Sequence, residues 1–224
     1  MAQEKSKDRP TVLIGLVTHH GEFAPKMSMA LDALVKRSCK DADLAIFKAF
    51  SAMLPHNRNL CAAEAIKLNA SHLLFIDSDM VFDDDALLTL LKHDRDIVSG
   101  LCVARKPPFR PVAKVLREDG VYVVRENLGD GRFYSDLDGL GAAFLLVKTD
   151  VFRKTPPPWF AMPPFKTGVM GEDIYFSKVA KEHGYDLCID SSLVIGHIGE
   201  HTYTIYDHEN YMETQGSGED LVFV

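Results

Sequence analysis

The chain has 224 residues, of which 46% are hydrophobic and 25% are charged, a composition typical of one globular domain with a sizeable core. The formal net charge of -7 argues against a nucleic-acid backbone as the main partner, although a metal could still bring in a phosphorylated small molecule. The cysteines are scattered, and neither an apolar leader nor a run of about 18 apolar residues is evident, so we expect a soluble, cytoplasmic protein without a membrane span.

Predicted strands and helices alternate through the first half of the chain. Residues 1–10 are expected to form a flexible tail, and a single domain is expected to span 11–206. This order predicts an α/β fold with a mainly parallel central sheet and helices on both faces. Apolar spacing predicts strands at 11–17, 43–50, 73–76 and 96–103, and helices at 26–37, 57–69 and 83–91.

The second half of the chain predicts a small antiparallel portion. Asp119-Gly120 separates two short apolar runs, which indicates a β-hairpin. We expect residues 207–224 to form a weakly packed tail, whose apolar last four residues could belong to a contact in a homo-oligomer. Between hairpin and tail, the pattern predicts a strand at 139–147, a proline-rich functional loop at 155–171, a helix at 172–182, and strands at 185–189 and 193–195.

The strongest chemical signal lies at residues 71–79. Residues 73–76 carry no polar side chain, which is typical of a central strand, and Asp77 and Asp79 follow directly. The two carboxylates lie on the same side of an extended chain, at the sheet edge where ligands of open α/β sheets bind. Two hard oxygen ligands there suit Mg²⁺ or Mn²⁺. The alternative is a helix-capping Asp after a strand.

A second acidic motif and two histidines could contribute to the same site. Glu172 and Asp173 begin the helix predicted at 172–182, where acidic residues satisfy the helix dipole but could also act as a general base for an alcohol. His197 or His201 could complete a metal site with Asp79, and each could equally be a structural turn residue.

Basic and aromatic side chains offer further ligand contacts. Arg58, in the second predicted helix, could donate to phosphate oxygens. Arg105, Lys106 and Arg110 follow the fourth predicted strand and could do the same, although solvated loop charges are the usual case. Trp159 could stack under a sugar ring or anchor its loop.

In combination, these residues resemble the GT-A-type (Rossmann-like) glycosyltransferases, particularly the family-2-like enzymes of bacteria and their phages. The resemblance covers residues 11–200 and depends on the order of the motifs more than on any one of them. The motifs are Arg58-Asn59, Phe75-Ile76-Asp77-Ser78-Asp79, Gly139-Leu140-Gly141-Ala142-Ala143-Phe144, Pro158-Trp159-Phe160, Gly171-Glu172-Asp173 and Gly196-His197-Ile198-Gly199.

The resemblance implies a nucleoside-diphosphate sugar as donor and Mn²⁺ or Mg²⁺ as cofactor. Asp79 would be the direct metal ligand, Asp77 would lie nearer the ribose or a metal-bound water, and His197 would be a further metal ligand. The residues around Thr18 would line the nucleobase and ribose pocket. The implied donor-binding set is Thr18, Arg58, Asp77, Ser78 and Asp79.

The resemblance also implies a reaction. Asp173 matches the general base of inverting members, and Glu172 would lie beside the acceptor, a carbohydrate or another molecule with a hydroxyl group. The segment 139–142 would shape the donor-sugar and acceptor pocket. The chain lacks the membrane helices and the Gln/Arg-x-x-Arg-Trp motif of processive synthases, which favours transfer of a single sugar.

Three other functions share parts of this pattern. A retaining glycosyltransferase of the same fold stays open. A nucleotidyltransferase would place a glycine-rich basic loop after the first strand, where this chain has Thr18-His19-His20-Gly21-Glu22. A non-catalytic sugar-nucleotide or carbohydrate-binding module would tolerate the loss of Asp79, Asp173 or His197, and all three are present. The donor's base and sugar and the acceptor depend on pocket shape, which the sequence does not specify.

Overall fold

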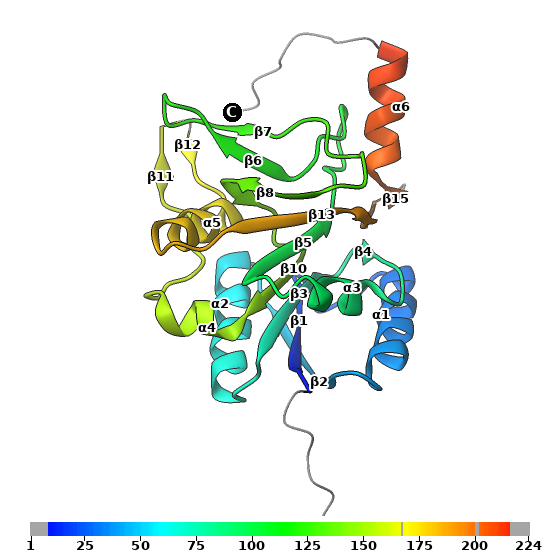
Figure 1. Ribbon diagram of the computed structural model, residues 1–224, viewed down its shortest axis with the longest axis vertical. Helices are drawn as coiled ribbons and strands as arrows, with labels where there is room; N and C mark the ends of the chain where they lie inside the picture. The colour runs from blue at the N-terminus through cyan, green and yellow to red at the C-terminus, as the bar shows by residue number, and fades with distance from the viewer. Residues whose placement is uncertain (1–8, 167, 200–201, 216–224) are drawn as a thin grey trace, which may run out of the picture.

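A seven-stranded sheet with the order β2-β1-β3-β10-β5-β13-β8 runs through the centre of the molecule (Figure 1). The computed structural model describes residues 9–166, 168–199 and 202–215. The strands of this sheet are β1 (Thr11–Thr18), β2 (Asp43–Phe50), β3 (His72–Asp77), β5 (Ile97–Leu101), β8 (Phe133–Leu137), β10 (Phe144–Lys148) and β13 (Leu187–Val194).

The sheet is mixed, so the prediction of a mainly parallel sheet is confirmed only in part. β1 is parallel to β2 and β3, and β5 is parallel to β13, whereas β10 is antiparallel to both its neighbours and β8 is antiparallel to β13. The segment predicted as one strand at 139–147 forms two strands, β9 (Gly139–Leu140) and β10. Because Phe144 pairs with Ile76 near the end of β3, β10 enters the sheet from that edge and runs back against β3.

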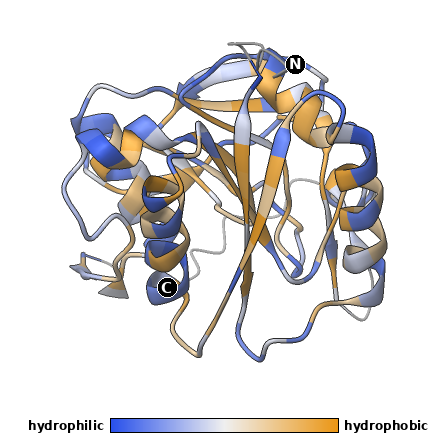
Figure 2. Cartoon of the chain, turned by 90° about the horizontal axis from the view of Figure 1, so that it is seen from below, coloured by the Kyte–Doolittle hydropathy of each residue, from blue (hydrophilic) through white to orange (hydrophobic). Residues whose placement is uncertain are grey.

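Helices cover both faces of the sheet. α1 (Pro25–Ser38) and α3 (Ala86–Lys92) lie on one face, and α2 (Leu54–Lys67), α4 (Thr149–Lys154) and α5 (Glu172–Glu182) lie on the other (Figure 1). Strand residues alternate between two buried clusters: Ile14 packs with the α1 and α3 side, and Leu13 with the α2 side. Figure 2 shows the result, with hydrophobic strands enclosed by helices whose outer faces are hydrophilic.

The helix boundaries follow local signals. α1 and α2 each have a proline in the first turn, where its missing N–H costs no hydrogen bond. α3 begins at Ala86 after the cap residue Asp85, so the three aspartates at 83–85, predicted as the start of this helix, precede it. α5 has the bounds predicted for residues 172–182, and this prediction is confirmed.

Three small sheets complete the fold. β6 (Ala113–Leu116) and β7 (Tyr122–Val124) pair antiparallel, so the hairpin predicted at Asp119-Gly120 is confirmed. Gly120 has a φ of 78°, which a glycine adopts without strain. The sheets consist of β6, β7 and β9; of β4 (Met80–Val81), β14 (Gly196–Ile198) and β15 (Thr202–Tyr203); and of β11 (Pro164–Phe165) and β12 (Gly168–Val169).

Among its described residues, the C-terminal part contains two strands, β14 and β15, and one helix beyond the predicted elements. β13 is continuous where two short strands were predicted. α6 (Ile205–Gln215) overlaps the tail predicted from residue 207, and Ile205 and His208 are buried. The apolar residues 221–224 lie outside the described residues. In the part of the chain that the structure describes, no helix combines the length and apolar character needed to cross a membrane.

Candidate active site

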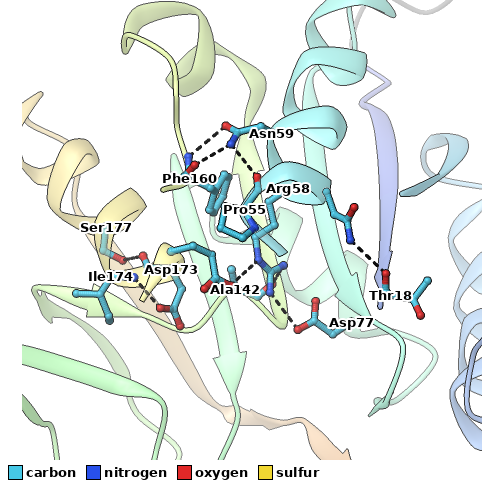
Figure 3. A network of polar contacts seen from close by, with 12 residues as sticks. Thr18, Pro55, Arg58, Asn59, Asp77, Ala142, Phe160, Asp173, Ile174 and Ser177 are labelled. Carbon is cyan, nitrogen blue, oxygen red and sulfur yellow. Dashed lines mark hydrogen bonds and ion pairs between the residues drawn. The ribbon is translucent and has the colours of Figure 1, made fainter. Parts of the chain in front are cut away.

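Acidic side chains from two distant motifs converge on the guanidinium group of Arg58 (Figure 3). Asp77 ends β3, Glu172 begins α5, and Arg58 lies in α2 between them. Arg58 Nη2 donates to Asp77 Oδ2 at 3.0 Å, and Arg58 Nε donates to Glu172 Oε1 at 3.3 Å. The carboxyl end of β3 and the amino end of α5 are thereby held together by one cation.

Arg58 is buried, with 3% of its side chain exposed. Its third contact is a donation from Nη1 to the carbonyl oxygen of Ala142 at 3.0 Å, and its guanidinium lies 5.7 Å from the ring centroid of Phe75. Burial alone would lower the pKa of Arg58, but the charges of Asp77 and Glu172 outweigh burial and raise this pKa above its ordinary value. Arg58 therefore positions two carboxylates, and its predicted contact with phosphate stays a prediction.

Asp77 is left with an unused oxygen. Its Oδ1 is buried and has no hydrogen-bond partner among the described residues. Burial raises the pKa of Asp77, and the contact with Arg58 opposes that shift. A buried carboxylate oxygen without a donor is costly, and a ligand hydroxyl, a water or a cation would satisfy it.

The pairing of β4 with β14 brings Asp79 next to His197. His197 lies opposite Met80 in this small sheet, and the amide of Ile198 donates to the carbonyl oxygen of Asp79 at 2.7 Å. His197 Nε2 lies 3.4 Å from Asp79 Oδ2. The two metal ligands predicted from separate motifs are thus neighbours, whereas His201 lies outside the described residues.

The donor set at Asp79 and His197 fits a divalent cation. His197 Nδ1 lies 3.1 Å from the carbonyl oxygen of Val103, which can only accept, so Nδ1 carries the proton. Nε2 then faces Asp79 Oδ2, so that a doubly protonated ring donates to this carboxylate, whereas a neutral ring offers a lone pair that a cation shared with Asp79 would accept. Among residues 9–166, 168–199 and 202–215, no group of three His, Cys, Asp or Glu side chains is placed to hold a metal. A cation would therefore need a phosphate or water oxygens as further ligands.

The charge of Asp79 is stabilised in place. Burial alone would raise its pKa, but the hydrogen bond from His197 and the charges of His197 and Arg105 outweigh burial and lower it. A low pKa keeps the carboxylate ionised, which is the form that a metal or a cationic side chain requires.

Asp173 has a different environment, although it is adjacent to Glu172. Burial and the charge of Glu172 raise its pKa to about 6, against the opposing hydrogen bond from the amide of Ile174. Ser177 donates its hydroxyl to the carbonyl oxygen of Asp173, one turn earlier in α5 (Figure 3). A carboxylate that binds a proton near neutral pH is suited to general-base chemistry.

The predicted nucleotide-binding residues Thr18 and Ser78 stabilise the adjacent turn. Thr18 is buried and donates its hydroxyl to the carbonyl oxygen of Glu22 at 3.0 Å. The backbone of Ser78 accepts from the amide of Ala24 and donates to Val17, each at 3.0 Å. These bonds attach residues 18–24 to the end of β3, and the predicted contacts of Thr18 and Ser78 with a nucleotide stay predictions.

The structure also places residues whose role the sequence left open. Trp159 Nε1 donates to the carbonyl oxygens of Phe152 and Thr155, so the indole anchors its loop. Asn59 accepts from the amides of Trp159 and Phe160, which attaches this loop to α2. Arg105, for which the sequence left a phosphate contact and a solvated loop charge open, donates to Asp79 Oδ2 at 2.9 Å. Its basic residue type and its position after the fourth strand indicated a possible ligand contact, but they did not indicate that its partner is Asp79.

A separate hollow lies at the opposite end of β3, with a volume of about 350 Å³. Its cations already have acidic partners, because Lys148 pairs with Asp94 and Arg153 with Asp150. Asp77 and Asp79 lie at the other end of this strand, so the hollow is not part of the candidate site. Its lining consists of Asn69, Ala70, Ser71, His72, Lys148, Asp150 and Arg153.

Comparisons with known proteins identify the fold but not the function. No protein-family model and no curated protein matches the sequence. Among solved structures, A197 from STIV is similar over 85% of this chain and 86% of its own length, with 19% identity and a TM-score of 0.55. At this identity, the similarity to A197 establishes a shared fold only.

Two further structures are similar over most of the chain at lower TM-scores. One is described as a glucose-1-phosphate thymidylyltransferase from Bacillus anthracis in complex with a sucrose, with 11% identity, 95% and 97% coverage and a TM-score of 0.49. The other is the inositol-1-phosphate CTP transferase from T. maritima, with 11% identity, 95% and 98% coverage and a TM-score of 0.44. At these TM-scores, neither bears on the function of this chain.

Proposed function

We propose that this protein is a metal-dependent glycosyltransferase that moves one sugar from a nucleoside-diphosphate sugar to an acceptor hydroxyl with inversion. The observation that carries the proposal is the joining of two acidic motifs by Arg58, with ionised Asp79 beside His197 at one end and Asp173 at the other. One end is suited to the leaving diphosphate and the other to the attacking alcohol.

Asp173 acts as the general base in this proposal. Its carboxylate accepts the proton of the acceptor hydroxyl while the hydroxyl oxygen forms a bond to the anomeric carbon. The bond from that carbon to the diphosphate oxygen breaks, and the electron pair leaves with the diphosphate. A pKa of about 6 leaves Asp173 mostly ionised at pH 7 and still basic enough to accept the proton.

The other residues bind and orient the substrates. Asp79 and His197 hold the divalent cation, which supplies Lewis-acid stabilisation of the negative charge on the leaving diphosphate. Arg58 fixes Asp77 and Glu172 in position through its two ion pairs. The loop at 155–171, anchored through Trp159, excludes water that would otherwise hydrolyse the donor.

A donor screen tests this proposal. Wild-type protein is incubated with each common nucleoside-diphosphate sugar, with Mn²⁺ or with EDTA, and released nucleoside diphosphate is measured. We expect release from one donor that stops in EDTA and in Asp79→Ala. Asp84→Ala is the matched control, because Asp84 is an exposed carboxylate in the following loop.

Other outcomes would redirect the assignment. Pyrophosphate release from a nucleoside triphosphate with a sugar 1-phosphate would favour a nucleotidyltransferase instead. Retention of anomeric configuration in the product would remove the role of Asp173 as base while leaving the metal site. Absence of release from every donor, with no nucleotide-dependent thermal shift, would contradict the proposal.

A further inference from the structure

Arg105 lies where a cation would bind in the candidate site. Its Nη1 donates to Asp79 Oδ2 at 2.9 Å and to the carbonyl oxygen of Ile198 at 3.2 Å. His197 Nε2 approaches the same carboxylate oxygen to 3.4 Å. A guanidinium group and a divalent cation at this oxygen would therefore compete for one position.

The segment that carries Arg105 is held at both ends. Val103 and Pro111 form an isolated antiparallel bridge, and the amide of Ala104 donates to the carbonyl oxygen of Arg110 at 2.9 Å. These bonds close residues 103–111 into a loop whose base is fixed to the end of β5. Arg105 is thus presented to Asp79 by an ordered backbone.

The C-terminal region braces the tip of the same loop. The ring of Phe109 stacks on Tyr203 of β15, with 5.2 Å between centroids. His208 of α6 makes a hydrogen bond through Nδ1 to the carbonyl oxygen of Pro108 at 2.5 Å. The position of Arg105 therefore depends on the packing of residues 202–208 as well as on its own loop.

Exposure and the number of carboxylate partners distinguish Arg105 from Arg58. Arg58 is buried and makes hydrogen bonds to two carboxylates, so it has little freedom to leave them. The side chain of Arg105 is 48% exposed, and among the described residues it has one carboxylate partner, Asp79. A half-exposed arginine on a fixed backbone can exchange one anionic partner for another at low cost, and a guanidinium group binds phosphate oxygens in the same bidentate geometry as a carboxylate.

We propose that Arg105 is a resident cation of the site: it occupies Asp79 in the free protein and turns to the diphosphate group when a divalent cation takes its place. This inference rests on the proposed function, because it assumes a diphosphate ligand. One positive charge is exchanged for another at Asp79, and the displaced charge remains available to the substrate. Arg105 is then a diphosphate-binding residue that also lowers the metal affinity of the empty site.

The test measures binding rather than turnover. Isothermal titration calorimetry determines the Kd of Mn²⁺ for wild type, Arg105→Gln and Lys106→Gln without nucleotide. The Kd of pyrophosphate, a diphosphate probe without base or sugar, is measured in excess Mg²⁺, because Arg105 is expected to turn to the diphosphate only once a cation binds Asp79. We expect Arg105→Gln to bind Mn²⁺ about tenfold more tightly and pyrophosphate about tenfold more weakly, the effect of one charge-assisted hydrogen bond. Lys106→Gln removes the same charge from the adjacent position and is expected to change neither Kd by more than about twofold.

The opposite results are equally clear. Unchanged or weaker Mn²⁺ binding by Arg105→Gln would overturn the inference, as would the absence of measurable Mn²⁺ binding by all three proteins. Equal losses of pyrophosphate binding in both variants would show a diffuse charge effect and overturn it too. None of these results depends on turnover, so failure of the proposed function is detected separately in the donor screen.

Discussion

The side chain of Asp173 is subject to two opposing effects. In the first turn of α5, a negative charge interacts favourably with the helix dipole. Burial and the neighbouring charge of Glu172 act in the other direction and raise the pKa of Asp173 to about 6. Because the raised pKa shows that the second effect is larger, the ionised form of Asp173 destabilises the folded protein.

Asp173→Asn separates catalysis from stability. The carboxyl group of Asp173 binds its proton more tightly in the folded state than in the unfolded state. Wild-type stability therefore falls as pH rises from the ordinary aspartate pKa of 3.8 to the folded-state pKa of about 6, and the loss is complete above pH 6. We expect Asn to raise stability at pH 8 by about 1–3 kcal/mol, measured by urea unfolding. Transfer should fall by about 10²–10⁴-fold. Wild-type kcat/KM should fall as pH drops below about 6.

Glu182→Gln serves as the matched control for this prediction. Glu182 is an acidic residue at the other end of α5, where it pairs with Lys178 on the surface. Its substitution should leave both transfer and stability nearly unchanged. A less stable Asp173→Asn protein, or one with full activity, would show that Asp173 serves the helix rather than the reaction.

Two glycines allow β9 to pack closely between its neighbours. A Cβ at Gly139 would lie 2.8 Å from the Cδ1 of Ile174 in α5, and a Cβ at Gly141 would lie 2.6 Å from the Cγ1 of Val112. Both distances are shorter than a van der Waals contact between carbon atoms. Close packing at Gly139 and Gly141 determines where the chain turns toward Ala142, whose carbonyl oxygen accepts from Arg58.

Gly141→Ala is expected to destabilise the protein by about 1–3 kcal/mol, because the added methyl group displaces Val112 or the strand. Urea unfolding of Gly141→Ala, Val112→Ala and the double variant measures the effect. If the clash with Val112 is the cause, the two substitutions should be coupled by about 0.5–3 kcal/mol, with the Gly141→Ala cost smaller in the Val112→Ala background. An equal cost in both backgrounds would place the strain elsewhere.

At the scale of the whole molecule, the far half of the sheet is held together by a polar contact. His93, at the end of α3, makes a 2.7 Å hydrogen bond through Nε2 to Asp190 Oδ2 in β13, and its ring packs at a tilt against Phe133 of β8. Burial alone would raise the pKa of Asp190, but hydrogen bonds from Ser192 and His93 lower it. His93 therefore connects the end of α3 with two strands, β13 through the carboxylate of Asp190 and β8 through the ring of Phe133.

The Asp190 contact predicts how stability depends on acid. Because its folded-state pKa is depressed, its contribution is present above the unfolded pKa of about 3.9 and is lost as pH falls below it. We expect Asp190→Asn to lose about 1–3 kcal/mol at pH 7. The difference from wild type should shrink between pH 5 and pH 3 in urea unfolding curves. A difference that is constant with pH would mean that shape, and not charge, explains the effect.

Local patterns predicted much of the fold and several site residues. The apolar run before Asp77 predicted β3, and the acidic start and apolar spacing of residues 172–182 predicted α5, because strand and helix periods are short-range properties. The direction of β10 was not predictable, since it depends on pairing with β3, whose partner residues are about seventy positions earlier in the chain. Arg105 shows the same limit at the site, because a loop charge does not reveal its partner.

Periodicity, caps and turn residues act over a few positions, so local patterns indicated the chemical groups of this site and most of the elements that carry them. Which groups meet depends on how the chain packs. Arg58 joins Asp77 to Glu172 across 19 and 114 positions, and strand pairing places His197 beside Asp79. Burial at these meeting points then separates the pKa values of Asp79 and Asp173, because desolvation and neighbouring charges are properties of the packed chain.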